Sequence, residues 1–151
     1  MITGFHHTGV VVHDLPAMTA FYQDVIGLAL LGEIDSVAPP EGNHTGIPNA
    51  RRKLVFLGIA GDHQIELVHY LDPPAAPGGT GSHQLNAMHI CFVVDDLRGE
   101  FERLQDAGVR FLTEPKFSLV DGREVGVVYG QDPEGNWIEF IEGLPKFAAE
   151  E

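Results

Sequence analysis

The sequence predicts an α+β fold built from two tandem βαβββ modules. The first observation is an internal repeat: HTGVVVHDL begins at His7, HICFVVDDL begins at His89, and a shift of 82 residues superposes them. The second is that the Ile-Glu pair ending at Glu66 recurs at Glu139, 73 residues later. The third is an amphipathic helix pattern directly after each repeated strand. A repeated supersecondary unit predicts two similar modules whose strands form a cupped mixed sheet.

Each module begins with an apolar, β-branched strand that runs directly into a helix. Asp14 and Asp96 stand at the two junctions, and Asp is a good N-cap because its carboxylate accepts the free amide hydrogens of the first helical turn. Apolar residues then recur with helical spacing and end at a glycine suited to a C′ position. These stripes are Met18, Phe21, Tyr22 and Val25 before Gly27, and Leu97, Phe101 and Leu104 before Gly108.

Three strand-like runs follow each helix. They are LALLGEI, RRKLVFLGI and HQIELVHYL in the first half, and VRFLTEP, EVGVVYG and NWIEFIE in the second. The offset between the repeats falls from 82 to 73, so the first module holds about nine extra residues, which we assign to the loop VAPPEGNHTGIPN. The prediction is one domain over residues 1–151, with modules at 4–71 and 86–142 and a Pro/Gly-rich linker at 72–85.

The composition disfavours several classes of partner. Nine basic residues stand against 22 acidic ones, for a net charge of -13, which disfavours binding to nucleic acid or to anionic membranes. The one cysteine, Cys91, excludes an intrachain disulfide and fits a reducing cytoplasm. No apolar run is long enough to span a bilayer, and the N-terminus does not have the pattern of a signal peptide.

Four polar residues occupy equivalent positions in strands that are otherwise apolar: His7, Glu66, His89 and Glu139. One such histidine alone is more often a core or surface residue than a ligand. An unpaired carboxylate inside a strand is unfavourable, because burying a charge costs several kcal/mol. Two histidines and two glutamates on equivalent strands are explained together if they face a common divalent cation.

Other polar residues leave alternatives open. Cys91 is two residues after His89, and a small packing residue is the expected role rather than a thiolate ligand. His44 is a second candidate acid or base, with a solvated loop histidine as the default. Arg51, Arg52 and Lys53 either bind an anionic group of the substrate or are solvated.

The chain resembles the vicinal oxygen chelate (VOC) superfamily of glyoxalase I, methylmalonyl-CoA epimerase, extradiol dioxygenases and bleomycin- or fosfomycin-resistance proteins. The segments that carry the resemblance are HHTGVVVHDLPAMTAFYQDVIGL, QIELVHY, MHICFVVDDL and DPEGNWIEF, within roughly residues 4–142. The resemblance implies metal ligation by His7, Glu66, His89 and Glu139. The implied ion is divalent, with Zn, Ni, Co and Mn all compatible and Fe fitting less well.

The activity implied by the resemblance is metal-dependent isomerisation, epimerisation or lyase chemistry through enolisation of a small substrate with vicinal oxygens. Glu139 or Glu66 would be the catalytic base. An Fe(II) extradiol-type dioxygenase is one alternative, although that class holds iron with two histidines and only one glutamate. A non-catalytic drug-binding protein is the other, although that class usually lacks the metal ligands. The resemblance also implies a homodimer.

Two positions differ from glyoxalase I. Its glutathione-binding Arg and Asn correspond here to Val11 and Tyr70, so lactoylglutathione is not the expected substrate. Methylmalonyl-CoA epimerase carries a catalytic Glu in the region that reads ARRKLVFLG here. The segments GIPNARRKLVFLG and IELVHYLDPP resemble instead a subgroup that includes cyclitol (valiolone-type) epimerases.

Overall fold

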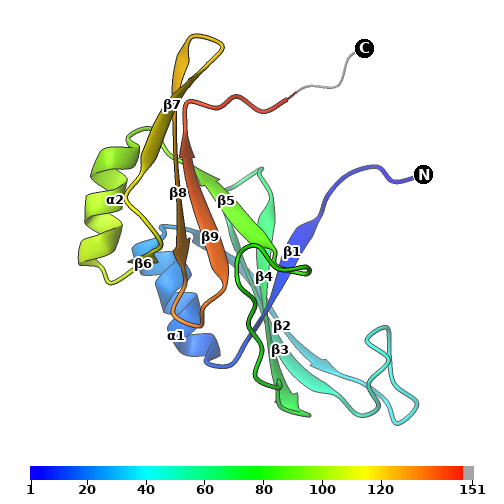
Figure 1. The fold of residues 1–151 in the computed structure, drawn as a ribbon. Helices are drawn as coiled ribbons and strands as arrows, with labels where there is room; N and C mark the ends of the chain where they lie inside the picture. Colours follow the sequence, from blue (N-terminus) through cyan, green and yellow to red (C-terminus); the bar gives the residue numbers. More distant parts are fainter. Residues whose placement is uncertain (148–151) are drawn as a thin grey trace. The chain divides into compact units, whose positions relative to one another are not determined.

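The computed structural model describes residues 1–147. Contacts divide the chain into two units, one at Met1–Gly78 and one that begins at Gly79. The boundary lies inside the stretch 72–85 that was predicted as a linker. Figure 1 shows strands and one helical segment in each unit, so the fold is α+β as predicted.

The first unit is a four-stranded mixed sheet with one helical segment (Figure 1). The strand order is β1-β4-β3-β2, in which β1 is parallel to β4 and the other neighbours are antiparallel. The elements are β1 (His7–Val12), α1 (Leu15–Ala20), the π-helical turn η1 (Phe21–Val25), β2 (Ala29–Val37), β3 (Arg51–Gly58) and β4 (Gln64–Asp72). The predicted insertion is the loop between β2 and β3.

The second unit repeats this plan. Its strands run in the order β5-β9-β8-β6, β7 also pairs with β8, and β5 is parallel to β9. The elements are β5 (His89–Val93), α2 (Leu97–Asp106), β6 (Arg110–Phe111), β7 (Lys116–Val120), β8 (Arg123–Gln131) and β9 (Trp137–Glu142). The N-terminus of α2 is tied to β9 by a hydrogen bond of 2.8 Å from the Leu97 amide to Glu142 Oε2.

The predicted helix caps are confirmed. Asp14 Oδ1 accepts a hydrogen bond of 3.0 Å from the Ala17 amide, and Asp96 Oδ1 accepts one of 3.0 Å from the Gly99 amide. Gly108 follows α2 with a positive φ of 91°, a conformation that favours glycine at the C′ position. The caps fix where each helix begins, directly after the strand that carries a candidate histidine.

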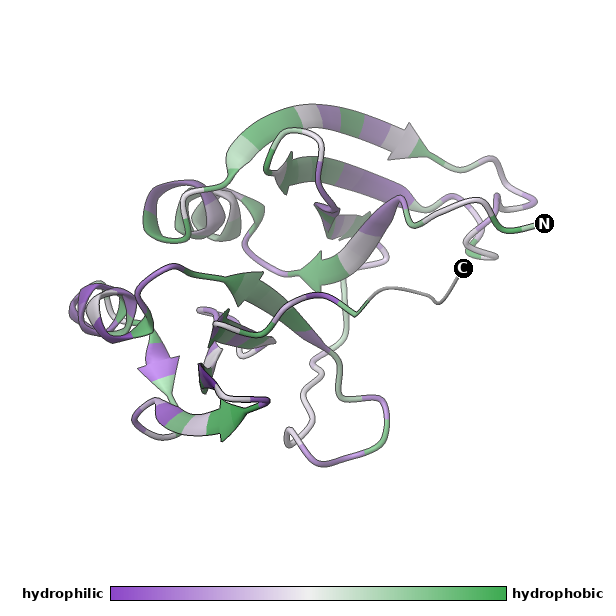
Figure 2. Cartoon of the chain, turned by 90° about the horizontal axis from the view of Figure 1, so that it is seen from above, coloured by the Kyte–Doolittle hydropathy of each residue, from purple (hydrophilic) through white to green (hydrophobic). Residues whose placement is uncertain are grey.

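Apolar side chains from the helices pack against one face of each sheet. The fully buried ones in the first unit include Met18, Tyr22, Leu57 and Leu67, and in the second Leu97, Leu104 and Ile138. Figure 2 shows hydrophobic residues along the strands of both units, with hydrophilic residues frequent in the connecting loops. Because side chains alternate along a strand, Glu66 and Glu139 lie on the opposite face from their buried neighbours. No helix in residues 1–147 is long and apolar enough to cross a membrane.

The strand predicted over residues 109–115 is wrong in its extent. It is divided into β6, with two residues, and β7, which begins at Lys116. Both pieces pair antiparallel with successive parts of β8. They therefore form one interrupted edge of the sheet, with the interruption between Phe111 and Lys116. Pro115 lies in the gap; proline has no amide hydrogen to donate to a neighbouring strand, which accounts for an interruption there.

A tight turn leads into β9 and is organised by one buried carboxylate. Asp132 is fully buried, and its Oδ1 accepts hydrogen bonds of 3.0 Å from the Glu134 amide and 2.9 Å from the Asn136 amide. Its Oδ2 accepts a third, of 2.8 Å, from Asn136 Nδ2. The turn thereby sets the start of the strand that carries Glu139.

Asp132→Ala is expected to lower the free energy of unfolding by about 2–3 kcal/mol, because it leaves several hydrogen-bond donors of the turn without an acceptor. Urea denaturation of the metal-free protein measures the change. The control is Asp95→Ala, an exposed aspartate for which a change within about 0.5 kcal/mol is expected. Equal stabilities of the two variants would show that the Asp132 carboxylate does not hold the turn.

Candidate metal centre

The first candidate pair lies in the first unit, on two parallel strands. His7 Nε2 of β1 is 3.2 Å from Glu66 Oε2 of β4. In the register of the two strands Gly9 is opposite Glu66, so His7 is two residues earlier on the same face. The side chains are 35% and 15% exposed, which keeps both within reach of a ligand from solvent.

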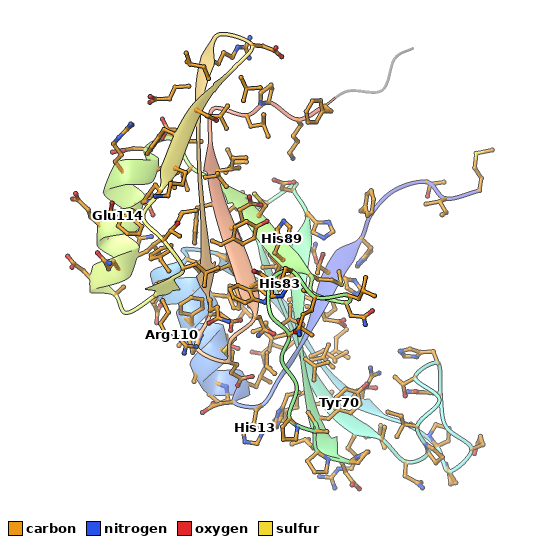
Figure 3. All side chains as sticks on the ribbon, viewed as in Figure 1. His13, Tyr70, His83, His89, Arg110 and Glu114 are labelled. Carbon is orange, nitrogen blue, oxygen red and sulfur yellow. The ribbon has the colours of Figure 1, made fainter. Side chains whose placement is uncertain are left out.

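The second unit holds the same arrangement. His89 Nε2 of β5 is 3.1 Å from Glu139 Oε2 of β9, with side chains 43% and 14% exposed. Cys91 is opposite Glu139, as Gly9 is opposite Glu66. Figure 3 shows the labelled His89 on β5. The same two atoms therefore face each other in both pairs, at nearly the same distance.

The spacing of each pair fits two neighbouring ligands of one metal ion. Ligand atoms about 2.1 Å from a divalent ion, at angles between octahedral and tetrahedral values, lie about 3.0–3.4 Å apart. The two N···O distances, 3.2 and 3.1 Å, fall in this range. Imidazole nitrogen and carboxylate oxygen are both common ligands of divalent metal ions. Each pair therefore has the residue types and the spacing of two neighbouring ligands.

The structure thus brings the four predicted ligands together as two pairs, one in each unit. No group of three or more His, Cys, Asp or Glu side chains suited to a metal occurs within residues 1–147. A pair alone offers two ligands, so a four-ligand centre requires both pairs. That convergence stays a prediction.

The two pairs differ in what surrounds them. Opposite Glu66 on β3 is Phe56, whose ring meets that of His7 edge to face at 5.7 Å. Opposite Glu139 on β8 is Tyr129, whose hydroxyl lies 3.3 Å from His89 Nε2. No sequence pattern singled out Tyr129, although it occupies the position equivalent to Phe56 in the repeat, 73 residues later.

Two groups beside Glu139 hold their protons. Burial, the nearby Glu139 carboxylate and a hydrogen bond to it together raise the pKa of the Cys91 thiol to about 12. Burial, followed by the charge of Glu139, raises the pKa of the Tyr129 phenol above its usual value. Both groups are therefore neutral at physiological pH in the metal-free protein.

Three other histidines lie outside the two pairs. His69, on the opposite face of β4 from Glu66, has its Nδ1 3.3 Å from the Val12 carbonyl oxygen. It lines a cavity of about 720 Å³ between α1 and strands β2, β3 and β4. His44, in the β2–β3 loop, is 3.4 Å from Arg52 Nη2 and is not one of the four paired residues. His6 contacts the ring of His7 through Nδ1 at 2.7 Å.

Comparison with known proteins gives relatives that match most of this chain. The uncharacterized protein YwbC of Bacillus subtilis is 30% identical over 139 residues, covering 90% of this chain and 94% of the relative. A lactoylglutathione lyase of Haemophilus influenzae is 31% identical over 139 residues, covering 90% of each. The chain spans about half the length of some other relatives, for example 46% of the lactoylglutathione lyase of Schizosaccharomyces pombe.

A solved structure of a glyoxalase family protein from Bacillus cereus shares the fold, with a TM-score of 0.82 at 22% identity, covering 96% of this chain and 97% of that one. The description of the matching family is Glyoxalase/Bleomycin resistance protein/Dioxygenase superfamily, and it covers residues 4–140. The paired strands, the repeated His–Glu pairs and this match agree. The chain belongs to the glyoxalase/bleomycin resistance protein/dioxygenase (VOC) superfamily.

Proposed function

We propose that the protein is a metal-dependent isomerase or epimerase, or a glyoxalase-like lyase, that enolises a small substrate with two vicinal oxygens. The observation that carries the proposal is the repeated pair of Nε2 and Oε2 atoms at 3.2 and 3.1 Å. In this proposal His7, Glu66, His89 and Glu139 hold one divalent ion, either within one chain or across two chains. The lactoylglutathione lyases among the relatives support chemistry of this kind.

The bound ion would supply Lewis-acid polarisation of a carbonyl group and so acidify the neighbouring C–H bond. Glu139 is the first candidate for the base that removes this proton and returns it to the same or a neighbouring carbon, and Glu66 is the second. The phenol oxygen of Tyr129 lies 3.3 Å from His89 Nε2, beside the same carboxylate, and its O–H group is placed to donate a hydrogen bond to a substrate oxygen. At the first pair the equivalent position is Phe56, which has no hydroxyl.

Glu66 distinguishes this proposal from O₂ activation. An extradiol site with two histidines and one glutamate leaves positions open for both catechol oxygens and for O₂. A fourth protein ligand removes one of these positions, which favours enolisation. Val11 and Tyr70, at the positions that bind glutathione in glyoxalase I, favour a substrate other than lactoylglutathione, and epimerase chemistry on a cyclitol-like ketone remains within the proposal. The lone Cys91 fits a cytoplasmic enzyme.

The deuterium exchange of a substrate C–H bond tests the proposal. The metal-loaded protein is incubated in D₂O with a panel of α-hydroxyketones, cyclitol ketones and acyl-CoA esters. Glu139→Gln is expected to lower the exchange rate by at least about 100-fold, the usual range for loss of a general base, with a smaller loss of bound metal. Glu66→Gln should be milder, because some epimerases that this chain resembles carry Gln at that position.

The control variant is Glu33→Gln, which changes an exposed glutamate of β2 and should leave exchange unchanged. Absence of exchange with every member of the panel would contradict the proposal. Consumption of O₂ with a catechol and Fe(II) would replace it with the dioxygenase alternative. Specific binding of a small molecule without metal or turnover would favour the binding-protein alternative.

We also propose a homodimer. Edge strands of both sheets carry exposed apolar side chains, including Val11 of β1, Ile34 of β2 and Val93 of β5, and apolar sheet edges call for cover. Sedimentation velocity at micromolar concentration should give the mass of two chains. A single species with the mass of one chain would refute the dimer.

A further inference from the structure

Arg52 is a buried cation at the start of β3. It is 7% exposed, whereas its neighbours Arg51 and Lys53 are exposed. Its Nη2 donates a hydrogen bond of 3.0 Å to Ser36 Oγ and one of 3.4 Å to His44 Nε2. Its Nε is buried and has no hydrogen-bond partner among the described residues.

The register of β3 separates Arg52 from the two basic residues beside it. Lys53 is opposite Asp35 on β2, and Arg51 is opposite Asp72 on β4, so each has an acidic residue across the sheet. The cross-strand partners of Arg52 are two neutral residues instead, Ser36 on β2 and Tyr70 on β4.

A guanidinium in this environment lacks the partner that its burial requires. Its Cζ lies 5.7 Å from the centre of the Tyr70 ring, and no carboxylate within residues 1–147 forms an ion pair with Arg52. Burial of a charge is unfavourable unless the charge is paired and hydrogen-bonded. A serine, a histidine and an aromatic ring provide dipoles but no negative charge.

Arg52 lies on the same face of the first sheet as the first candidate pair. It is four residues from Phe56 along β3, and Phe56 is opposite Glu66, which puts the two positions about 13 Å apart along the strand. Figure 3 shows Tyr70, the cross-strand neighbour of Arg52, toward the far end of the same sheet. A substrate of modest length could reach both positions.

We propose that Arg52 binds an anionic group of the substrate, a carboxylate or a phosphate, while its vicinal oxygens lie at the candidate metal centre. The binding of an anion by Arg52 is independent of the proposed function; the position of the vicinal oxygens rests on it. A planar guanidinium is suited to an oxyanion, because its N–H groups form a fork that matches two oxygens. The net charge of -13 repels anions over long range, so binding of an anion needs a local cation such as this one.

Titration of the metal-free protein with inorganic phosphate, and separately with acetate, tests the anion site by calorimetry at constant ionic strength. The wild-type protein should bind phosphate, acetate or both saturably. Arg52→Gln should weaken that binding by at least about tenfold, as expected for loss of a charge-assisted hydrogen bond. The matched control is Arg51→Gln, which removes the same charge one residue away and should bind as the wild type does.

Folding of each variant is checked by circular dichroism. If Arg52→Gln does not fold, the Arg Nε–H resonances of the wild-type protein are followed by NMR during the same titration, with Arg52→Lys used for assignment. A saturable shift of the Arg52 Nε–H signal supports the site. Lack of saturable binding of either anion by the wild-type protein, or equal binding by Arg52→Gln, overturns it.

A comparison of anionic and neutral substrates tests the role of Arg52 separately from the proposed enolisation. Metal-loaded protein is assayed with α-hydroxyketones that do or do not carry a terminal carboxylate or phosphate. Arg52→Gln should raise KM at least about tenfold for the anionic member and leave the neutral member unchanged; an equal effect on both would overturn the substrate role. Anion binding without any exchange would retain the anion site and reject the proposed enolisation.

Discussion

Parallel pairing between the first and the last strand of each unit is the interaction on which the candidate centre depends. The chain must cross from β1 to β4, and from β5 to β9, through a helix and intervening strands, so the paired residues are far apart in sequence. The register then puts each histidine two residues before the position opposite a glutamate. Because side chains alternate along a strand, that offset keeps both on one face. The N–O separations of 3.2 and 3.1 Å follow from this backbone geometry in both units.

The two His–Glu pairs have the same backbone geometry but different neighbouring side chains. The position opposite Glu66 on β1 is Gly9, and the equivalent position on β5 is Cys91. The aromatic residue beside each pair is Phe56 in one unit and Tyr129 in the other. One carboxylate thus has hydrogen-bond donors near it and the other has apolar neighbours. Such an asymmetry suits a site in which two chemically similar carboxylates have different roles, since the environment decides which of two carboxylates acts as a base.

The sequence predicted those features that depend on local pattern or on the repeat. The helix caps at Asp14 and Asp96 were predictable because an N-cap is a short-range interaction. The two His–Glu pairs were predictable because a histidine and a glutamate recur at equivalent strand positions in both modules. The gap at Pro115 was missed, although proline is visible in the sequence. Tyr129 and the burial of Arg52 were missed for a different reason: they depend on strand register and on the loop that brings His44 to Arg52. Register is a long-range property that strand alternation alone does not reveal.

The two equivalent His–Glu pairs are proposed to hold one divalent ion. Equilibrium dialysis against Zn²⁺, with metal content measured by mass spectrometry, tests it in the wild-type protein and in two double variants, His7→Gln with Glu66→Gln, and His89→Gln with Glu139→Gln. We expect about one tightly bound ion per chain in the wild-type protein, as for a four-ligand site. Either double variant should lose that ion, and the control His69→Gln should retain it. A double variant that retains wild-type affinity and stoichiometry would contradict the claim, because one pair would then bind the ion without the other.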